Sequence, residues 1–490
     1  MTPTSTDQYS TTDPYSAQER RYVRGIIATI VVLAILCGGF LVLNTLQGPK
    51  LSSATVDRTL VTSQAGQQLR LFANQNLAQI TAKQVVVRPA APVTVTTTGQ
   101  VIAVQFDQRL DYGTRYSITV KGVHSSYQDQ RAEFHYSFST AAASLYYLDR
   151  ADPAKGADGL DSVVRTGLKG SASREVYSAR HIQEFVVFSG LIAVVTIADD
   201  GTDRLDLVQV SDPTKVEHIA LPVPGIVEKL QASPDGTRIG FVFSGGGVSD
   251  ELMTVDLTGT HQVAAVVGLN GQPLQVLDWF FLSARPASGA GTTAGASAGS
   301  NSIVAQATDQ SVTLIDPTNP TLATPLGTFS ALEGESPDGT SILVADPLSR
   351  ISLRLRDLRE TRLETHEVGG NQTFGGAMQL LADEGGQAAS VQQAAVPDPR
   401  TGAYETYLLY QRGSSTTRIL FGGQDYTGSI DDFSVSPNGQ YVAVATVPDF
   451  ATSTSDGYPH EPRATSVTTI FIEVATGRVV RSVAGFDVDW

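Results

Sequence analysis

Three stretches of the chain share one pattern: Ser233-Pro-Asp-Gly-Thr-Arg-Ile-Gly-Phe-Val-Phe, Ser336-Pro-Asp-Gly-Thr-Ser-Ile-Leu-Val-Ala and Ser436-Pro-Asn-Gly-Gln-Tyr-Val-Ala-Val-Ala. In each, proline presets a tight turn, glycine accepts a positive φ, and an apolar strand follows. Each stretch therefore predicts a hairpin between two strands. The three starts lie about 100 residues apart, roughly the length of two blades of a β-propeller, so weaker blades are expected between them.

A second pattern fills those gaps: an apolar strand ends in a polar turn and another strand follows. Seven such hairpins begin at Leu145, Leu205, Leu252, Val312, Leu353, Tyr407 and Thr469. They predict a propeller of about seven blades over residues 144–490, with six or eight blades left open. The Ser-Pro-Asp-Gly strands resemble the TolB-type and other WD-like propeller repeats of bacterial proteins, over about 350 residues. That resemblance implies the same fold.

The two ends of this region complement each other. The last residues, Gly485-Phe-Asp-Val-Asp-Trp490, read as one more inner strand, whereas the hairpin at Leu145 lacks an inner strand. A ring whose first blade takes its inner strand from the C-terminus would explain both observations and would protect exposed strand edges. We therefore expect Trp490 to be ordered. Residues 284–302, rich in Gly, Ala and Ser, are expected to form a flexible insertion within the third blade.

Residues 51–141 alternate apolar and polar side chains, as in Ile102, Val104 and Phe106. This alternation places one strand face on a core and predicts a β-sandwich. The stretch resembles the bacterial Ig-like domains of S-layer and other surface proteins, most specifically in the Leu-x-x-Gly-Thr-x-Tyr core at 110–116. The resemblance implies a spacer or adhesion module and no catalytic residue. His124 and His135 are interpreted as surface or strand-face histidines rather than ligands.

An apolar run without charge extends from Gly25 to Leu43, long enough to span a bilayer as a helix. Arg20, Arg21 and Arg24 precede it, so the positive-inside rule predicts a transmembrane helix over residues 25–46 and a disordered cytoplasmic tail over residues 1–24. Phosphorylation of that tail remains an open alternative to a plain solvated tail. A cleaved signal peptide and a lipoprotein acylated at Cys37 are weaker alternatives, because the run is long and lacks the small residues that such processing requires.

The charge and cysteine content of the chain limit its possible binding partners and cross-links. The net charge of -15 disfavours nucleic acid, which binds clustered Lys and Arg. Cys37 is the only cysteine and falls inside the apolar run, so the rest of the chain has no disulfide and no thiolate metal site. Its stability must come from burial and strand pairing.

Three places in the sequence are candidates for metal binding, catalysis or partner binding. The stretch Asp199–Asp206 could ligate calcium, although its spacing fits no standard loop and a polar turn explains it. Asp487 and Asp489 alternate around Val488 and are expected to share one face of the last strand, where they could line a central channel and act as acid and base. The long loop with Tyr458-Pro-His-Glu-Pro-Arg463 is a candidate partner-binding loop.

No nucleotide loop, nucleophile elbow, zinc helix or Cys-x-x-Cys motif occurs. The sequence therefore predicts an all-β ectodomain, a sandwich plus a propeller, on one transmembrane helix in the cell membrane. We expect a bacterial envelope binding or scaffold protein whose propeller meets a protein or envelope partner. No catalytic residue, metal or cofactor is assigned, and an enzyme is not expected. An envelope glycan- or peptide-acting enzyme with a site in the propeller channel is the alternative, and carbohydrate recognition is a third possibility.

Overall fold

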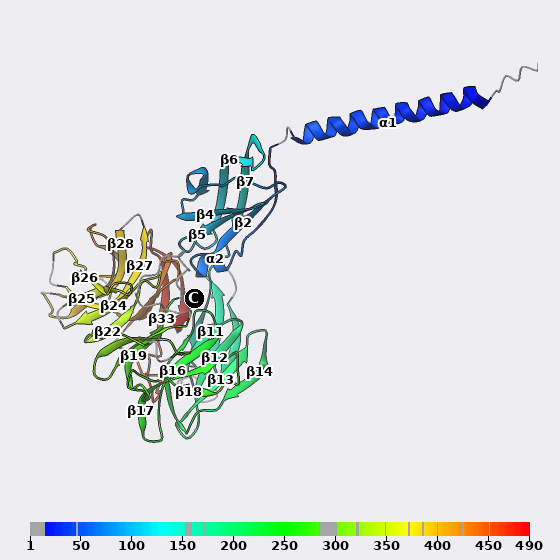
Figure 1. Ribbon diagram of the computed structural model, residues 1–490. Helices are drawn as coiled ribbons and strands as arrows, with labels where there is room; N and C mark the ends of the chain where they lie inside the picture. The colour runs from blue at the N-terminus through cyan, green and yellow to red at the C-terminus, as the bar shows by residue number, and fades with distance from the viewer. Residues whose placement is uncertain are drawn as a thin grey trace, which may run out of the picture. The chain divides into compact units, whose positions relative to one another are not determined.

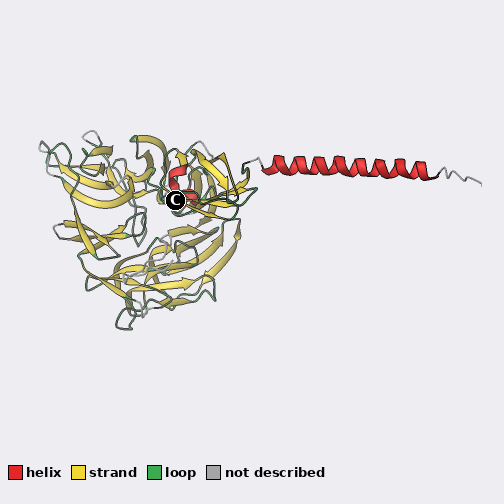
Figure 2. Ribbon diagram, turned by 45° about the horizontal axis from the view of Figure 1, so that its top comes forward, coloured by secondary structure: helices red, strands yellow, loops and turns green. Residues whose placement is uncertain are grey.

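The computed structural model describes residues 15–45, 48–151, 159–169, 173–283, 301–319, 323–347, 349–370, 373–384, 387–398, 400–423, 426–449 and 451–490. Apart from helix α1 (Tyr15–Thr45) and the short helical turns α2 (Leu60–Ser63) and η1 (Ala82–Gln84), the regular structure in this part of the chain is β-strand (Figure 2). The all-β prediction is confirmed. Of the predicted tail and insertion, residues 1–14 and 284–300 lie outside the described residues, and α1 begins inside the predicted tail.

Within the described residues, seven four-stranded antiparallel sheets form the blades of a propeller, named here in chain order with the inner strand of each blade first. Blade 1 contains β35 (Phe486–Asp489), β8 (Ser144–Asp149), β9 (Asp161–Gly167) and β10 (Arg174–Ala179). Blade 2 contains β11 (Ile182–Phe188), β12 (Leu191–Ile197), β13 (Asp203–Gln209) and β14 (Asp212–Ile219). Blade 3 contains β15 (Gly225–Ala232), β16 (Arg238–Gly245), β17 (Val248–Asp256) and β18 (Val263–Ala265).

The remaining four blades follow the same order of strands. Blade 4 contains β19 (Val276–Phe281), β20 (Ile303–Ala307), β21 (Ser311–Ile315) and β22 (Thr324–Thr328). Blade 5 contains β23 (Ala331–Glu335), β24 (Ser341–Asp346), β25 (Ser349–Arg354) and β26 (Arg359–Leu363). Blade 6 contains β27 (Phe374–Glu384), β28 (Gln387–Pro397), β29 (Tyr404–Arg412) and β30 (Arg418–Gly422). Blade 7 contains β31 (Ser429–Val435), β32 (Tyr441–Val447), β33 (Thr468–Glu473) and β34 (Arg478–Ala484).

The three Ser-Pro-Asx-Gly turns join the first and second strands of blades 3, 5 and 7, so the predicted two-blade spacing is confirmed. In each turn the glycine amide donates a 2.8 Å hydrogen bond to the serine carbonyl, and each glycine has a positive φ, between 63° and 72°. Proline at the second position and glycine at the fourth suit this geometry. The strands that flank the predicted insertion, β19 and β20, belong to blade 4 rather than to the third blade.

The C-terminal strand closes the ring. Strand β35 pairs antiparallel with β8, with Phe486 opposite Leu148 and Asp489 opposite Tyr146. In Figure 1 the C-terminus lies among the blades, close to β11 and β33. Trp490 is described, and its indole Nε1 donates a 3.1 Å hydrogen bond to the Ser434 hydroxyl. The predicted closure and the ordered Trp490 are both confirmed.

Apolar clusters lie between neighbouring blades rather than in one central core. Between blades 2 and 3, for example, Leu205 and Leu207 on β13 pack with Val227 on β15 and with Phe241 on β16. Each blade carries apolar side chains on both faces because it is covered on both sides, which is why a second strand such as β16 reads as a nearly continuous apolar run. Burial between sheets therefore holds a ring that contains no disulfide.

Two further sheets come from residues before the blades. One consists of β1 (Leu51–Thr55), β2 (Gln68–Ala73), β5 (Val101–Phe106) and β4 (Val93–Thr98), and the other of β3 (Val85–Arg88), β6 (Arg115–Ser125) and β7 (Gln128–Ser139). Ile102, Val104 and Phe106 are at most 1% exposed, as their alternation predicted. One compact unit comprises residues 1–56, 68–105 and 116–137. The other comprises the blades together with residues 57–67 and 106–115.

Among the described residues, no helix has both the length and the hydropathy that a membrane span requires. Helix α1 includes residues 25–45 of the predicted transmembrane segment, and Cys37 is an exposed free thiol on it.

Candidate functional site at the loop end of the propeller

The antiparallel blades give the ring two distinct ends. Inner strands β15, β23 and β31 run toward the Ser-Pro-Asx-Gly turns, and this end is called the turn end. Strand β32 runs back from the turn after β31, so the connection between β32 and β33 lies at the opposite end of the ring. This opposite end, which carries residues 456–464, is called the loop end. The predicted partner loop, Tyr458–Arg463, therefore lies at the loop end.

Every inner strand of the seven described blades has an irregular register in its pairing. The shifts fall at Phe486/Asp489, Ile182/Glu184, Glu228/Gln231, Val276/Asp278, Leu332/Gly334, Gly375/Met378 and Ile430/Asp432. A β-bulge leaves a residue out of the ladder and re-aims its side chain. Lys229, Asp431 and Asp487 are among the residues that these irregularities leave out of the ladder, and Glu184 and Asp432 are the first paired residues after two of the shifts. The bulges thus gather charge around the ring axis.

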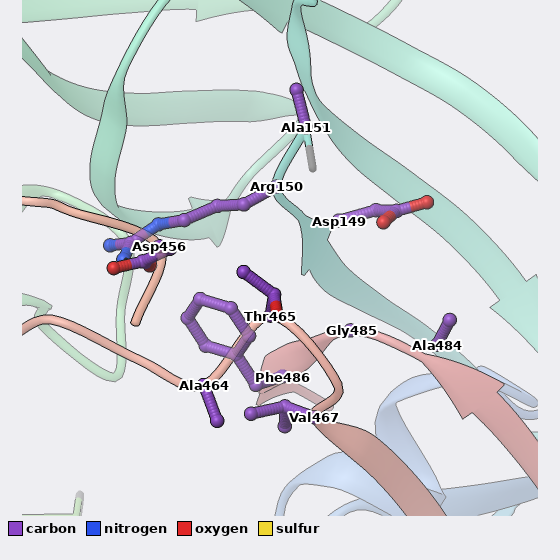
Figure 3. Close-up of a pocket in the computed structure, with 10 residues that line it drawn as sticks. All are labelled: Asp149, Arg150, Ala151, Asp456, Ala464, Thr465, Val467, Ala484, Gly485 and Phe486. Atoms are coloured by element: carbon purple, nitrogen blue, oxygen red, sulfur yellow. The ribbon is translucent and has the colours of Figure 1, made fainter. Parts of the chain in front are cut away.

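A buried ion pair fixes the loop-end segment 456–464. The Arg150 guanidinium lies 2.7 Å from the Asp456 carboxylate, and both side chains are 4% exposed. The other two guanidinium nitrogens of Arg150 donate to the carbonyls of Ile182, at 3.1 Å, and Gln183, at 2.9 Å. Figure 3 shows the guanidinium directed at Asp456. Because each nitrogen has an acceptor, the buried charge is well compensated and the loop is held to blades 1 and 2.

Aromatic rings enclose the same arginine. Its guanidinium carbon lies 3.8 Å from the ring centre of Tyr458 and 4.9 Å from that of Phe486. The Tyr458 hydroxyl donates to the Asp161 carboxylate. Burial and this hydrogen bond raise the pKa of Tyr458, so the phenol stays protonated. Tyr458 is therefore a structural residue of the loop, because its hydroxyl is hydrogen-bonded and its ring face contacts a guanidinium.

A pocket opens beside this cation–aromatic contact (Figure 3). Its walls come from the end of β8, the loop end and the start of β35. The lining residues are Asp149, Arg150, Ala151, Asp456, Ala464, Thr465, Val467, Ala484, Gly485 and Phe486. Segments from the beginning and the end of the propeller thus meet in one small, partly polar concavity.

Arg463 gathers acidic residues from two neighbouring inner strands. One guanidinium nitrogen lies 2.8 Å from the Asp431 carboxylate on β31, and another lies 3.7 Å from the Asp487 carboxylate on β35. Asp487 adopts a left-handed φ of 50°, which is uncommon for a residue with a side chain. Such backbone strain often marks a functional position.

The pKa values of two axial carboxyls are strongly shifted. Burial raises the pKa of Asp487 to about 6, against the opposing charges of Arg463 and Arg150. Burial also raises the pKa of Glu184 to about 7, partly offset by the Leu230 amide, which donates to it at 2.7 Å. The Asp487 side chain is 30% exposed.

The structure separates the two aspartates that the sequence paired. Asp487 faces Arg463, whereas Asp489 accepts a 2.5 Å hydrogen bond from the Val187 amide on β11 and fixes blade 1 to blade 2. The sequence predicted that Asp487 and Asp489 share one face of the strand and could act together as acid and base. Their different partners do not match that prediction. The physical reason is the irregular register of β35 between Phe486 and Asp489, which breaks strict alternation.

The other candidates have local structural partners. In the stretch Asp199–Asp206, Asp200 accepts from Thr202, Asp203 accepts from the Val227 amide at 2.8 Å, and Asp206 contacts His218 at 3.0 Å. Across the described ranges, no three His, Cys, Asp or Glu side chains gather as a metal site. His135 contacts Thr119 on the neighbouring strand. His124 contacts the Ser125 carbonyl.

Sequence reasoning missed Arg150 and Glu184, and it did not connect Arg463, which lies on the candidate loop, with either of them. Their positions in the chain are far apart, and none lies in a recognisable motif. Asp487 and the loop 458–463 were identified, but only the closed ring shows that they belong together.

Comparison with known proteins finds solved structures that are similar to this chain, whereas no family model and no curated protein matches it. TolB from Acinetobacter baumannii is 16% identical, with a TM-score of 0.38, covering 83% of this chain and 82% of TolB. Dihydro-heme d1 dehydrogenase NirN in complex with DHE is 12% identical, with a TM-score of 0.41, covering 71% and 74%. A candidate 6-phosphogluconolactonase from Bacteroides fragilis is 12% identical, with a TM-score of 0.39, covering 71% and 96%.

These comparisons require one correction. The expected fold and the missing motifs led to the prediction that the protein is not an enzyme. That prediction is wrong, because the structural neighbours include a dehydrogenase and a candidate lactonase beside TolB. Propellers build sites from loops and inner strands of several blades, so a short linear motif is not required. The likeness itself concerns the fold: this chain is similar to TolB-type and other propellers.

Proposed function

We propose that this protein is a membrane-anchored, extracytoplasmic binding protein whose propeller presents its loop end to a protein or envelope partner. The observation that carries the proposal is the fixing of loop segment 456–464 by the buried Arg150–Asp456 pair. A loop held in one conformation loses little entropy when it binds, which favours affinity. The exposed Glu461 and Pro462 lie on this same fixed segment.

Charge defines the surface that such a partner would meet. Glu461 contributes to the electrostatic environment of Glu184, Asp432 and Asp487, so its carboxylate lies near theirs. Arg463 supplies a counter-charge within this group and already contacts Asp431 and Asp487, and Arg150 supplies a second positive charge near Asp487. The loop end is therefore predominantly acidic, and a partner with basic residues would complement it.

In-cell crosslinking followed by mass spectrometry tests this function. Glu461→Lys reverses one exposed charge on the loop, and Glu360→Lys makes the same change on the outer strand β26 as a matched control. We expect a partner that crosslinks to the unaltered protein and to Glu360→Lys but is lost from Glu461→Lys. A partner set that is the same in all three proteins would move recognition away from the loop end.

The proposal includes a membrane anchor near the N-terminus and an extracytoplasmic propeller. Their support is the uncharged run from Gly25 to Leu43 and the three arginines that precede it. The unit of two small sheets would act as a spacer, as its resemblance to Ig-like domains implies. In a Cys37→Ser background, a cysteine at Glu360 should react with a membrane-impermeant maleimide on intact cells. Labelling only after lysis would contradict the orientation.

Acid–base catalysis at the loop end is a second candidate function. The observation that favours it is the pair of raised pKa values at Glu184 and Asp487, since general acids and bases work best near the ambient pH. Turnover of an envelope glycan or peptide that Asp487→Asn abolishes would support this function. An absence of turnover across glycan and peptide libraries would argue against it.

A further inference from the structure

A short segment of the propeller unit, residues 106–115, lies against the turn end of the ring. Arg109 makes its main contacts: one guanidinium nitrogen, Nη1, donates to the Pro337 carbonyl at 2.6 Å and to the Pro437 carbonyl at 3.1 Å. Its Nε donates to the Ser63 carbonyl at 2.8 Å. Both proline carbonyls belong to Ser-Pro-Asx-Gly turns, the feature by which the propeller was first predicted.

The position of these turns places Arg109 at the ring axis. Pro337 lies in the turn of blade 5 and Pro437 in the turn of blade 7, and blade 6 stands between them. One nitrogen atom can bond to both carbonyls only where the inner turns of separate blades converge. That place is the end of the axis, where Glu335 supplies a nearby negative charge.

Further contacts fix the rest of the segment to blade 7. The Asn438 side-chain amide donates to the Leu110 carbonyl at 3.0 Å, and the Tyr112 amide donates to the Gln440 side chain at 2.7 Å. The rings of Tyr112 and Tyr441 stack with centres 6.5 Å apart. Asn438 and Gln440 lie in and just after the third Ser-Pro-Asx-Gly turn, so that turn both closes a hairpin and holds the segment.

We propose that residues 106–115 form a cap that closes the turn end of the propeller, with Arg109 as its anchor. Solvent and solutes then reach the inner strands from the loop end alone. The cap is independent of the proposed function: it can be correct whether or not a partner binds at residues 456–464. If a partner does bind the ring axis, the cap restricts it to the loop end.

The tryptophan fluorescence of the protein can report on this cap. It has two tryptophans: Trp279 is 1% exposed, and Trp490 is partly buried in the apolar cluster that also holds Tyr112 and Tyr441. Trp490 follows the last inner strand and bonds to Ser434 near the third turn, so it lies at the turn end. Quenching of tryptophan fluorescence by acrylamide therefore reports mainly on Trp490.

The test compares full-length protein with three variants. Arg109→Met keeps the length of the side chain and removes its donors, Gln440→Ala removes the acceptor on the propeller side, and Arg356→Met, on a 65% exposed arginine, is the control. We expect a larger Stern–Volmer constant and emission at longer wavelength for Arg109→Met and a smaller change for Gln440→Ala. The control should match the unaltered protein.

Circular dichroism and thermal melting first establish that each variant is folded. If Arg109→Met does not fold, Gln440→Ala carries the test, because its side chain is partly exposed and contributes no apolar core. Quenching that stays unchanged in every folded cap variant would overturn the proposal. So would quenching in the unaltered protein that equals that of free tryptophan, because Trp490 would then be open to solvent with the segment in place.

Discussion

Arg150 and Asp456 form an ion pair of 2.7 Å between residues 306 positions apart in the sequence, and both side chains are almost fully buried. The pair joins the first strand after the small sheets to the loop that precedes β33. It lies beside Phe486, on the strand that closes the ring. One contact thus links ring closure to the shape of the loop end.

Removal of one partner of this pair should destabilise the propeller strongly. Asp456→Ala leaves the Arg150 charge buried without its counter-ion, and the expected loss is about 3–5 kcal/mol in the free energy of unfolding. Urea denaturation followed by circular dichroism measures it. The exposed pair Lys215–Asp212, at 3.5 Å, is the control, and Lys215→Ala should cost about 0–1 kcal/mol. Equal effects of the two variants would contradict the buried character of the first pair.

Phe486 should contribute to closure through its buried ring. It is 4% exposed, and Phe486→Ala should lower the free energy of unfolding by about 3–5 kcal/mol through lost burial and a residual cavity. Val479, 53% exposed on the outer strand β34, supplies the control, and Val479→Ala should change stability by about 0.5 kcal/mol or less. A small effect of Phe486→Ala would mean that β35 is not needed to hold the ring.

Gly240 on β16 should not tolerate a side chain. A Cβ at this position would lie 2.5 Å from the ring of Trp279, whose side chain is 1% exposed and has little room to move. Gly240→Ala should therefore cost about 1–3 kcal/mol through overpacking. Gly259 has no atom within 4 Å of its would-be Cβ, so Gly259→Ala is the matched control and should be close to neutral. Thermal melting compares the two.

Stability should depend on pH through Glu184. Burial raises its folded-state pKa from the ordinary value of 4.5 to about 7, so between these pH values the folded protein binds more protons than the unfolded chain. The free energy of unfolding should then fall as pH rises from about 4.5 to 7. Glu184→Gln removes this contribution and should flatten the profile relative to the unaltered protein.

The matched control for that measurement is Glu360→Gln on the outer strand β26, where the side chain is exposed. Its profile should follow that of the unaltered protein. Urea denaturation at intervals between pH 4.5 and 7.5 gives all three curves. A Glu184→Gln profile as steep as the other two would show that Glu184 does not take up its proton on folding.

Much of the architecture could be predicted from local pattern. Pro and Gly in the Ser-Pro-Asx-Gly turns restrict the backbone to a hairpin whatever the rest of the chain does, and the following apolar runs require cover on both faces. Turns at 233, 336 and 436 therefore indicated alternate blades, and the sheets between them were found at the predicted hairpins. The unpaired inner strand at Gly485–Trp490 likewise predicted closure, because an open strand edge is unfavourable.

The candidate site could be predicted only in part. The loop Tyr458–Arg463 and Asp487 were recognised as candidates from sequence, but a strict two-residue period wrongly placed Asp489 beside Asp487. The bulge in β35 is a property of pairing with β8 and leaves no signature in four residues. The contacts of Arg150 and Arg109 span more than 200 residues each, to Asp456 and to Pro337, so no local pattern indicates them.

The sequence by itself determined the local elements: tight turns, alternating strands, the apolar run near the N-terminus and the strand that ends at Trp490. These depend on the φ preferences of Pro and Gly and on side-chain periodicity, which act over a few residues. Only the tertiary structure decided which charged groups meet at the loop end and which segment lies at the turn end. Those pairings arise when the ring closes, because burial of a charge is tolerated only where a distant partner compensates it.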